Sequence, residues 1–216
     1  MSIQHTEQEH ITELGNPRKP EGEYGRQMLN RMSESHAGVT EWGLGFLALE
    51  PAHAVLDIGC GAGAALSRMA QTVTAGHLTG VDYSPVSVQT ARENNAEAVA
   101  AGRMEIVEAS VEALPFAEGT FDRIITVESF YFWPSPAENL AEVRRVLKDG
   151  GRFLLIADIY DCGALTEHER ENIRKFNLFN PTPEQFRTLF EAAGFTQIAV
   201  HLCSDGKPWI CVEGHK

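Results

Sequence analysis

The sequence predicts an α/β protein with a doubly wound, mostly parallel sheet of seven strands. Three observations lead to this prediction. Short apolar runs alternate with stretches that carry helix caps and helical periodicity, which is typical of a parallel sheet covered by helices on both faces. The last two apolar runs, 195–202 and 208–214, flank a Ser-Asp-Gly turn and indicate an antiparallel hairpin. The 216 residues also suffice for one domain with a full core.

The first 50 residues are predicted to form an arm and a helical lid ahead of the core. Glycines and prolines interrupt any helical period in residues 1–22, so this part is expected to be an irregular arm. Helical periodicity then predicts a short helix at 24–32 and a second at 38–49, which Pro51 ends. Residues 51–216 are predicted to form the core, and lid and core together make one domain.

The first half of the core shows the alternation of strands and helices most clearly. The apolar run before Gly59 lacks polar alternation, which indicates a strand buried on both faces. Ser84 and Pro85 form a typical N-cap and first helical residue. The predicted elements are a strand at 53–58, a helix at 64–71, a strand at 77–82, a long helix at 84–102 and a strand at 103–109.

The second half of the core continues the alternation and contains an insertion at 159–180. Ser135 is expected to cap a helix that Gly150 stops, and Thr182 with Gln185 forms a capping box. The predicted elements are a strand at 121–129, a helix at 135–151, a strand at 151–158, a helix within the insertion at 165–176, a helix at 182–195 and the two hairpin strands.

Composition excludes several classes of protein. The net charge of −12 would repel a phosphate backbone, so nucleic acid is not expected as a partner. The four cysteines form no C-x-x-C pair, which argues against a disulfide framework and a zinc cluster, and no metal is expected. No apolar run approaches the about 20 residues of a membrane span, and the first residues are polar and acidic. We therefore expect a cytoplasmic protein without a membrane partner.

Residues 55–63, VLDIGCGAG, place three glycines at alternate positions behind the first core strand. Such a turn brings backbone close to a ligand. It matches the dinucleotide template only weakly, and Ala64-Ala65 stand where a triphosphate loop needs Lys and Ser or Thr. Asp57 would repel a pyrophosphate and favour a ligand with an ammonium group. The alternative is that Asp57 only caps the turn.

Asp82 ends the second core strand and is the second indication of the ligand. A carboxylate at this position accepts hydrogen bonds from both hydroxyls of a ribose, which every adenosine ligand offers. The alternative is an anion that only stabilises the start of the next helix. Because the carboxyl ends of parallel strands share one edge, the loops after Ile58, Asp82, Ala109 and Glu128 are expected to surround one crevice.

Four motifs, in order, resemble those of class I S-adenosylmethionine-dependent methyltransferases, and the resemblance runs from about residue 36 to the C-terminus. The motifs are VLDIGCGAG, TGVDYSP, VEASVEALPFAEGTFDRIITVESFYFWP and VRRVLKDGGRFLLIAD. The resemblance implies a Rossmann-like methyltransferase fold, S-adenosylmethionine as cofactor and methyl transfer to a small-molecule acceptor.

The resemblance also implies roles for individual residues. The three glycines would approach the methionine end of the cofactor, Asp57 would hold its amino group, and Asp82 would bind the ribose. Ser110 stands where many relatives have an Asp that binds the adenine amino group, so this contact is in doubt. The implied cofactor-binding residues are Tyr24, Asp57, Gly59, Gly61, Gly63, Asp82, Tyr83, Ser110, Val111 and Glu128.

Methyl transfer from a sulfonium is an in-line displacement that needs alignment and exclusion of water, with a general base only for some acceptors. The candidate catalytic residues are His36, Glu128 and Tyr131. For His36 the alternative is an ordinary polar residue at a helix junction. The aromatic run after Glu128 suggests an apolar or planar acceptor, or core packing. Asp158 and Tyr160 are expected to complete the lid with the insertion.

Three other functions stay open. The stretch VEASVEALPFAEGTFDRIITVESFYFWP, which holds the third and fourth motifs of the family, is similar to that of menaquinone and ubiquinone methyltransferases, which favours carbon methylation of a quinone-like ring. An NAD-dependent oxidoreductase would use the same sheet, but a Tyr-x-x-x-Lys catalyst is missing. The last alternative is a protein that binds the cofactor without turnover. A homodimer is a further possibility.

Overall fold

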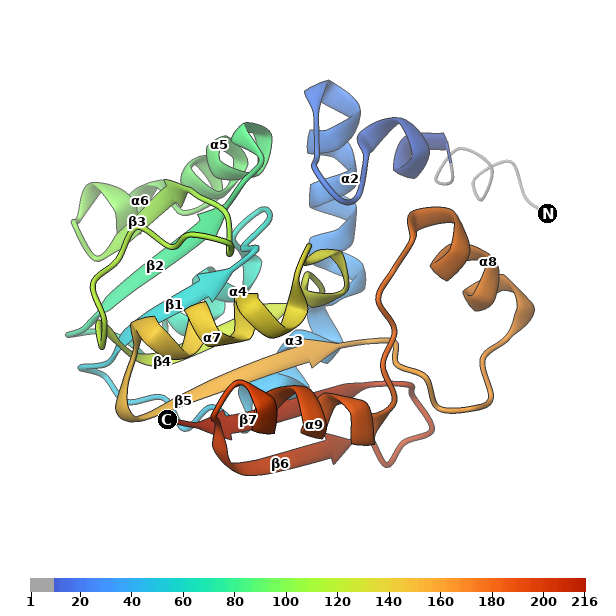
Figure 1. Ribbon diagram of the computed structural model, residues 1–216. Helices are drawn as coiled ribbons and strands as arrows, with labels where there is room; N and C mark the ends of the chain where they lie inside the picture. Colours follow the sequence, from blue (N-terminus) through green and yellow to red (C-terminus); the bar gives the residue numbers. More distant parts are fainter. Residues whose placement is uncertain (1–9) are drawn as a thin grey trace.

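A computed structural model describes residues 10–216 and contains one seven-stranded sheet (Figure 1). The strand order is β3-β2-β1-β4-β5-β7-β6, and neighbouring strands are parallel except for β7, which is antiparallel to β5 and β6. The predicted doubly wound sheet with a C-terminal hairpin is confirmed. The strands are β1 (Ala54–Ile58), β2 (His77–Asp82), β3 (Met104–Glu108), β4 (Phe121–Val127), β5 (Leu147–Ala157), β6 (Thr196–Leu202) and β7 (Ile210–His215).

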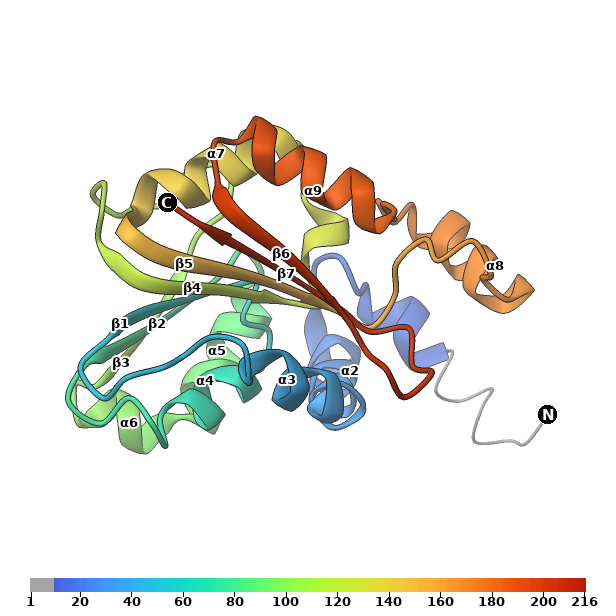
Figure 2. The same cartoon turned by 90° about the horizontal axis from the view of Figure 1, so that it is seen from below.

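Helices cover both faces of the sheet, as Figure 2 shows from below. On one face lie α7 and α9, and on the other lie α3, α4, α5 and α6. No helix in residues 10–216 is both long and apolar enough to cross a bilayer. The helices are α2 (Gly22–Ser35), α3 (Ala37–Leu44), α4 (Ala64–Met69), α5 (Pro85–Asn94), α6 (Ala96–Ala100), η1 (Phe130–Phe132), α7 (Pro136–Val146), α8 (Glu167–Phe176) and α9 (Pro183–Ala192).

Strand β1 explains why the run 53–58 lacks polar alternation. Its side chains point alternately to the two faces, and both faces are buried. Leu56 belongs to the core cluster under α7 and α9, which includes Phe190. Val55 belongs to the opposite cluster, which includes Leu66 of α4. The central strand is therefore held from both sides, and its carboxyl end is fixed in position.

Two predicted helix starts are confirmed. The Ser84 side chain accepts a hydrogen bond from the Ser87 amide, with Pro85 as the first residue of α5. Thr182 and Gln185 form the expected capping box at the start of α9. These caps satisfy amide groups that have no partner within the helix. The start of α5 lies directly after Asp82, so the Ser84 cap helps to position that carboxylate.

Three expected helices differ in the structure. The helix expected at 38–49 ends at Leu44, so Pro51 does not end it. The long helix at 84–102 is interrupted at Asn95, between α5 and α6, and the Asn95 side chain bonds the glycine turn there. The helix predicted at 135–151 ends at Val146, and β5 already begins at Leu147. Ser135 makes no side-chain cap there. The predicted stop at Gly150 was wrong, because strand pairing of Leu147 with Phe121 overrides the helical pattern.

The arm is more ordered than expected. Residues 1–9 of the predicted arm lie outside the described residues, but residues 10–15 are helical. The following segment crosses the carboxyl ends of the strands. The Ser84 hydroxyl donates to the Pro20 carbonyl oxygen at 2.6 Å, and the Tyr83 hydroxyl donates to the Arg18 carbonyl oxygen. Arg18 itself donates to the carbonyl oxygens of Phe132 and Asn177. The arm thus joins β2, η1 and the end of α8.

Candidate functional site

A cavity lies at the carboxyl ends of β1, β2 and β4, enclosed by α2 and the arm. The strand order reverses between β1 and β4, where ligands bind in sheets of this kind. Eight residues predicted for the site line this cavity: His36, Asp57, Gly59, Gly61, Asp82, Tyr83, Val111 and Glu128. Four others do not line it: Tyr24, Gly63, Ser110 and Tyr131.

The glycine turn forms the floor of the cavity, and its glycines have different tasks. Gly59, Gly61 and Gly63 all have positive φ values, between 52° and 78°. A Cβ atom on Gly59 would lie 2.4 Å from the Ser129 hydroxyl oxygen, and one on Gly63 would lie 2.5 Å from the Asn95 amide nitrogen. Those two positions need glycine for packing within the protein. Gly61 has no such neighbour within 3.4 Å and leaves its backbone open to the cavity.

Asp57 is a buried carboxylate with an unsatisfied oxygen. The residue is 1% exposed, and its Oδ1 atom has no hydrogen-bond partner in the described part of the chain. Burial, and then the negative charge of Asp82, raise the pKa of Asp57 to about 8. A buried oxygen without a donor is unfavourable unless a ligand supplies one. Since Asp57 lines the cavity, this oxygen suits a ligand with an ammonium group.

Asp82 both fixes the backbone and faces the cavity. Its two oxygens accept hydrogen bonds from the amides of Gly61 (3.0 Å) and Ser84 (2.9 Å). Burial raises the pKa of Asp82, and these two bonds oppose the rise. Asp82 therefore does stabilise the start of the next helix, as the alternative suggested. Each of its carboxylate oxygens can still accept a further hydrogen bond from a ligand. Next to it the Tyr83 ring is 39% exposed and is available at the cavity mouth.

Two predicted cofactor residues are engaged elsewhere. The Ser110 hydroxyl donates to the Glu112 carboxylate at 3.0 Å and accepts from the Glu112 amide. The neighbouring Val111 is 8% exposed and lines the cavity, so the backbone at this position is the nearer group. Tyr24 is 45% exposed and packs edge-to-face against His10. Neither Ser110 nor Tyr24 lines the cavity.

Glu128 forms the opposite end of the cavity, just beyond β4. It has a left-handed backbone, with φ of +54°, which is uncommon for a residue other than glycine. One carboxylate oxygen accepts from the Asp158 amide and the other from the Tyr131 hydroxyl, at 2.9 Å. Burial, and then the charge of Asp158, raise the pKa of Glu128 well above its usual value. Tyr131 lies outside the cavity and acts on it through Glu128.

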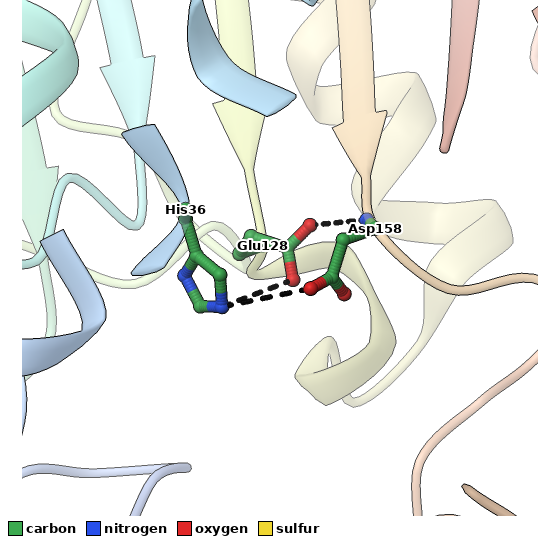
Figure 3. A group of neighbouring side chains, drawn as sticks. All are labelled: His36, Glu128 and Asp158. Atoms are coloured by element: carbon green, nitrogen blue, oxygen red, sulfur yellow. Dashed lines mark hydrogen bonds and ion pairs between the residues drawn. The ribbon is translucent and has the colours of Figure 1, made fainter. Parts of the chain in front are cut away.

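His36 completes a cluster with Glu128 and Asp158 (Figure 3). Its Nε2 atom lies 3.9 Å from a Glu128 oxygen and 3.8 Å from an Asp158 oxygen. Burial lowers the pKa of His36 and so favours a neutral imidazole. The charge of Asp158 opposes this shift. The three side chains therefore offer nitrogen and oxygen lone pairs to one point, and this arrangement can hold a proton or a metal ion.

From the sequence, Asp158 is expected only in the lid, and no role is predicted for Arg18. Asp158 follows β5 as Glu128 follows β4, and these strands are parallel neighbours, so their ends must adjoin. That relationship is the signal that would have placed Asp158 in the site. Arg18 lines the cavity because the arm folds over it, and no local pattern in the sequence indicates that fold.

The comparison with protein families shows that residues 56–155 match the model described as a methyltransferase domain. The chain is 31% identical over 159 residues to 2-methyl-6-phytyl-1,4-hydroquinone methyltransferase 1 of Oryza sativa, covering 71% of this chain and 46% of that protein. It is 32% identical over 156 residues to the ubiquinone/menaquinone biosynthesis C-methyltransferase UbiE of Methylobacterium nodulans, covering 60% of each. The chain spans about half the length of the curated relatives it matches.

Solved structures share the fold at low sequence identity. A methyltransferase of Haloferax volcanii in complex with the Trm112 activator has a TM-score of 0.75 and 21% identity, over 87% of this chain and 92% of that one. Phosphoethanolamine N-methyltransferase 2 of Haemonchus contortus in complex with S-adenosyl-L-methionine has a TM-score of 0.72 and 16% identity, over 83% of this chain and 52% of that one. At this identity the likeness shows the fold alone.

Proposed function

Because residues 56–155 belong to the methyltransferase domain family and form the centre of a class I S-adenosylmethionine-dependent methyltransferase fold, we propose that the chain transfers a methyl group from S-adenosylmethionine to a small-molecule acceptor. The observation that carries the proposal is the buried, unsatisfied oxygen of Asp57 in the cavity wall. It fits the ammonium group of the cofactor, whereas it would repel the pyrophosphate of a dinucleotide.

We assign the residues that line the cavity to successive parts of the cofactor, from its methionine end to its adenine. We assign Asp57 to the amino group, the backbone of Gly59 and Gly61 to the methionine end, and Asp82 to the ribose hydroxyls. Tyr83 would cover one face of the adenine, and the Val111 backbone amide would donate a hydrogen bond to a ring nitrogen. Gly63 supports the turn from behind, since it packs against Asn95. Ser110, Tyr24 and Glu128 remain proposed cofactor contacts, and of these only Glu128 lines the cavity.

When bound, the cofactor supplies an electrophilic methyl group on a sulfonium, so the chain has to align the acceptor and exclude water. The arm and α2 close the cavity from one side, and the apolar surfaces of Phe132 and Trp133 close it from the other. His36 and Glu128 face the acceptor end of the cavity, and Tyr131 positions Glu128. A neutral His36 would offer its lone pair either to an acceptor proton or to a bound cation.

The acceptor is proposed to be a small molecule with an apolar or planar part. Phe132 and Trp133 in the cavity wall support an apolar acceptor. The relatives named as hydroquinone and ubiquinone/menaquinone methyltransferases support a quinone-like ring as the more specific candidate. Binding of the cofactor without turnover remains the alternative from another class, and an NAD-dependent oxidoreductase is disfavoured by Asp57.

The organisation of the molecule is also a proposal. We propose that residues 1–50 act as a lid on the core of residues 51–216 within one domain, that the insertion at 159–180 takes part in acceptor selection, and that the chain acts in the cytoplasm without nucleic acid or membrane partners. A homodimer is compatible with this proposal. Size-exclusion chromatography with light scattering measures the oligomeric state directly.

Calorimetric titration with S-adenosylmethionine, S-adenosylhomocysteine and NAD in parallel tests the cofactor assignment. We expect saturable binding of the first two ligands and none of NAD. Binding of NAD alone would replace the proposal with the oxidoreductase alternative. If both S-adenosyl ligands bind, turnover is then measured as release of S-adenosylhomocysteine with a panel of quinols, phenols, amines and fatty acids. Binding without release of product across the panel would favour the non-catalytic alternative.

A further inference from the structure

The cluster of His36, Glu128 and Asp158 has a spacing that hydrogen bonding does not explain (Figure 3). His36 Nε2 lies 3.9 Å from Glu128 Oε2 and 3.8 Å from Asp158 Oδ2. Both distances are too long for a hydrogen bond. The residues come from the junction of α2 and α3, the end of β4 and the end of β5, so three separate segments bring these atoms to one point.

The size of the gap suits a metal ion. One ligand atom from each residue lies within 4.8 Å of the others. A point equidistant from three atoms at these spacings lies about 2.5 Å or less from each, and zinc binds imidazole nitrogen and carboxylate oxygen at about 2.0–2.2 Å. A shift of a few tenths of an ångström would complete the ligand set. The side of the cluster that faces the cavity would stay free for a further ligand.

No Lys or Arg side chain of the described residues pairs with the two carboxyl groups of this cluster. Glu128 and Asp158 instead both lie within 4 Å of the His36 imidazole. The overall charge of −12 makes an adjacent pair of carboxylates more unfavourable still. A bound cation would favour the ionised form of both carboxyl groups and offset the repulsion between them.

Glu128 is already held in the orientation that a ligand needs. The Tyr131 hydroxyl donates to Glu128 Oε2, the oxygen nearest to His36, and the Asp158 amide donates to the other oxygen. Carboxylates that ligate a metal are commonly fixed by such neighbouring donors. Each bonded oxygen keeps acceptor capacity, so these bonds and a metal bond are compatible.

We propose that His36, Glu128 and Asp158 form a binding site for a divalent first-row metal ion at the acceptor end of the cavity. One imidazole with two carboxylates suits Mn²⁺, Fe²⁺ or Zn²⁺. The ion binds an oxygen of the acceptor, which defines the substrate class as molecules with a hydroxyl able to ligate a metal. The proton of that hydroxyl passes to solvent when its oxygen binds the ion.

The substrate class rests on the proposed methyl transfer. The acceptor oxygen forms a bond to the methyl carbon, and the electron pair of the broken carbon–sulfur bond stays on sulfur, which yields a methyl ether and a thioether. In this arrangement the His36 lone pair binds the ion. Because the acceptor hydroxyl loses its proton to solvent when its oxygen binds the ion, the enzyme needs no separate general base.

The test is titration of the chelator-treated chain of 216 residues with Mn²⁺, monitored by electron paramagnetic resonance, and with Zn²⁺, monitored by calorimetry. We expect one saturable site in the wild type. His36→Ala, Glu128→Gln and Asp158→Asn should each weaken binding at least about tenfold. Glu50→Gln is the matched control, because Glu50 pairs with His53 at 3.7 Å outside the cavity, and it should leave metal affinity unchanged.

Circular dichroism establishes whether each variant is folded. Because three different residues are substituted, weaker binding in every folded variant cannot come from one folding defect. Absence of saturable binding in the wild type, or equal binding in wild type and all three variants, would overturn the metal site. Titration with S-adenosylhomocysteine in the same samples separates the two proposals. Metal binding without S-adenosylhomocysteine binding would overturn the proposed function alone, and the reverse result would overturn the metal site alone.

Discussion

The side-chain amide of Asn95 donates hydrogen bonds to the carbonyl oxygens of Gly63 and Ala91, at 3.3 Å and 3.0 Å. Its oxygen accepts a bond from the Ser67 hydroxyl at 2.6 Å. Through this one buried side chain, the break between α5 and α6 is tied to the glycine turn and to α4. The floor of the cavity therefore depends on a residue that does not line it.

The substitution Asn95→Ala should destabilise the protein by about 2–3 kcal/mol, because it removes these bonds and leaves their buried partners unsatisfied. It should also weaken S-adenosylhomocysteine binding, since the glycine turn loses its support. Urea unfolding and calorimetry measure the two effects. Asn172→Ala, in exposed α8, is the control and should change the free energy of unfolding by less than about 0.5 kcal/mol. Equal effects at both positions would contradict the role of Asn95.

The pair Gly59→Ala and Gly102→Ala separates steric crowding from backbone strain. Both glycines have positive φ, +72° and +68°, so both substitutions incur a strain of about 1 kcal/mol. Only the Gly59 Cβ would meet another atom, Ser129 Oγ at 2.4 Å, whereas nothing lies within 4 Å at Gly102. Gly59→Ala should therefore be more destabilising by about 1–3 kcal/mol in urea unfolding. Similar losses would show that Ser129 moves away without a penalty.

Much of the site could be predicted because it depends on strand ends. Asp57 and Asp82 lie in or beside strands whose apolar pattern is clear, and adjacent parallel strands bring their carboxyl ends together. The helix break at Asn95 and the path of Arg18 could not be predicted, because both are set by contacts with residues more than 25 positions away. The position of Asp158 could be predicted only in part. It follows from the pairing of β4 with β5, which places Asp158 beside Glu128.

Asp82→Ala should weaken the binding of S-adenosylhomocysteine by about 2–3 kcal/mol, or roughly 30- to 150-fold, through the loss of charged hydrogen bonds to the ribose. Because Asp82 also bonds the amides of Gly61 and Ser84, the variant should lose stability as well. Calorimetry on protein with a native circular dichroism spectrum measures the affinity. Asp205→Ala, in the exposed hairpin turn, is the control. Unchanged affinity in a folded Asp82 variant would remove this residue from the binding site.

Asp57 should make the ligand-free protein less stable as the pH rises. The pKa of its carboxyl is raised from 3.8 to about 8 by burial and by Asp82. Between these values the unfolded chain has released a proton that the folded protein retains, so this contribution to stability is present at low pH and is lost as the pH rises to about 8. Asp57→Asn removes the titration. The stability of this variant relative to the wild type should grow from about pH 4 to pH 8, by about 5 kcal/mol for a pKa raised from 3.8 to about 8.

The same substitution should weaken S-adenosylhomocysteine binding, because a neutral amide attracts an ammonium group less than a carboxylate does. Urea unfolding of wild type and Asp57→Asn across this pH range, with calorimetry at neutral pH, measures both effects. Subtracting the two unfolding curves cancels the contribution of Glu128, whose pKa is also raised. A gain in stability together with a loss of affinity is expected of a group that is unfavourable in the empty cavity and satisfied by its ligand. Parallel curves with unchanged affinity would mean that Asp57 finds its partner within the protein.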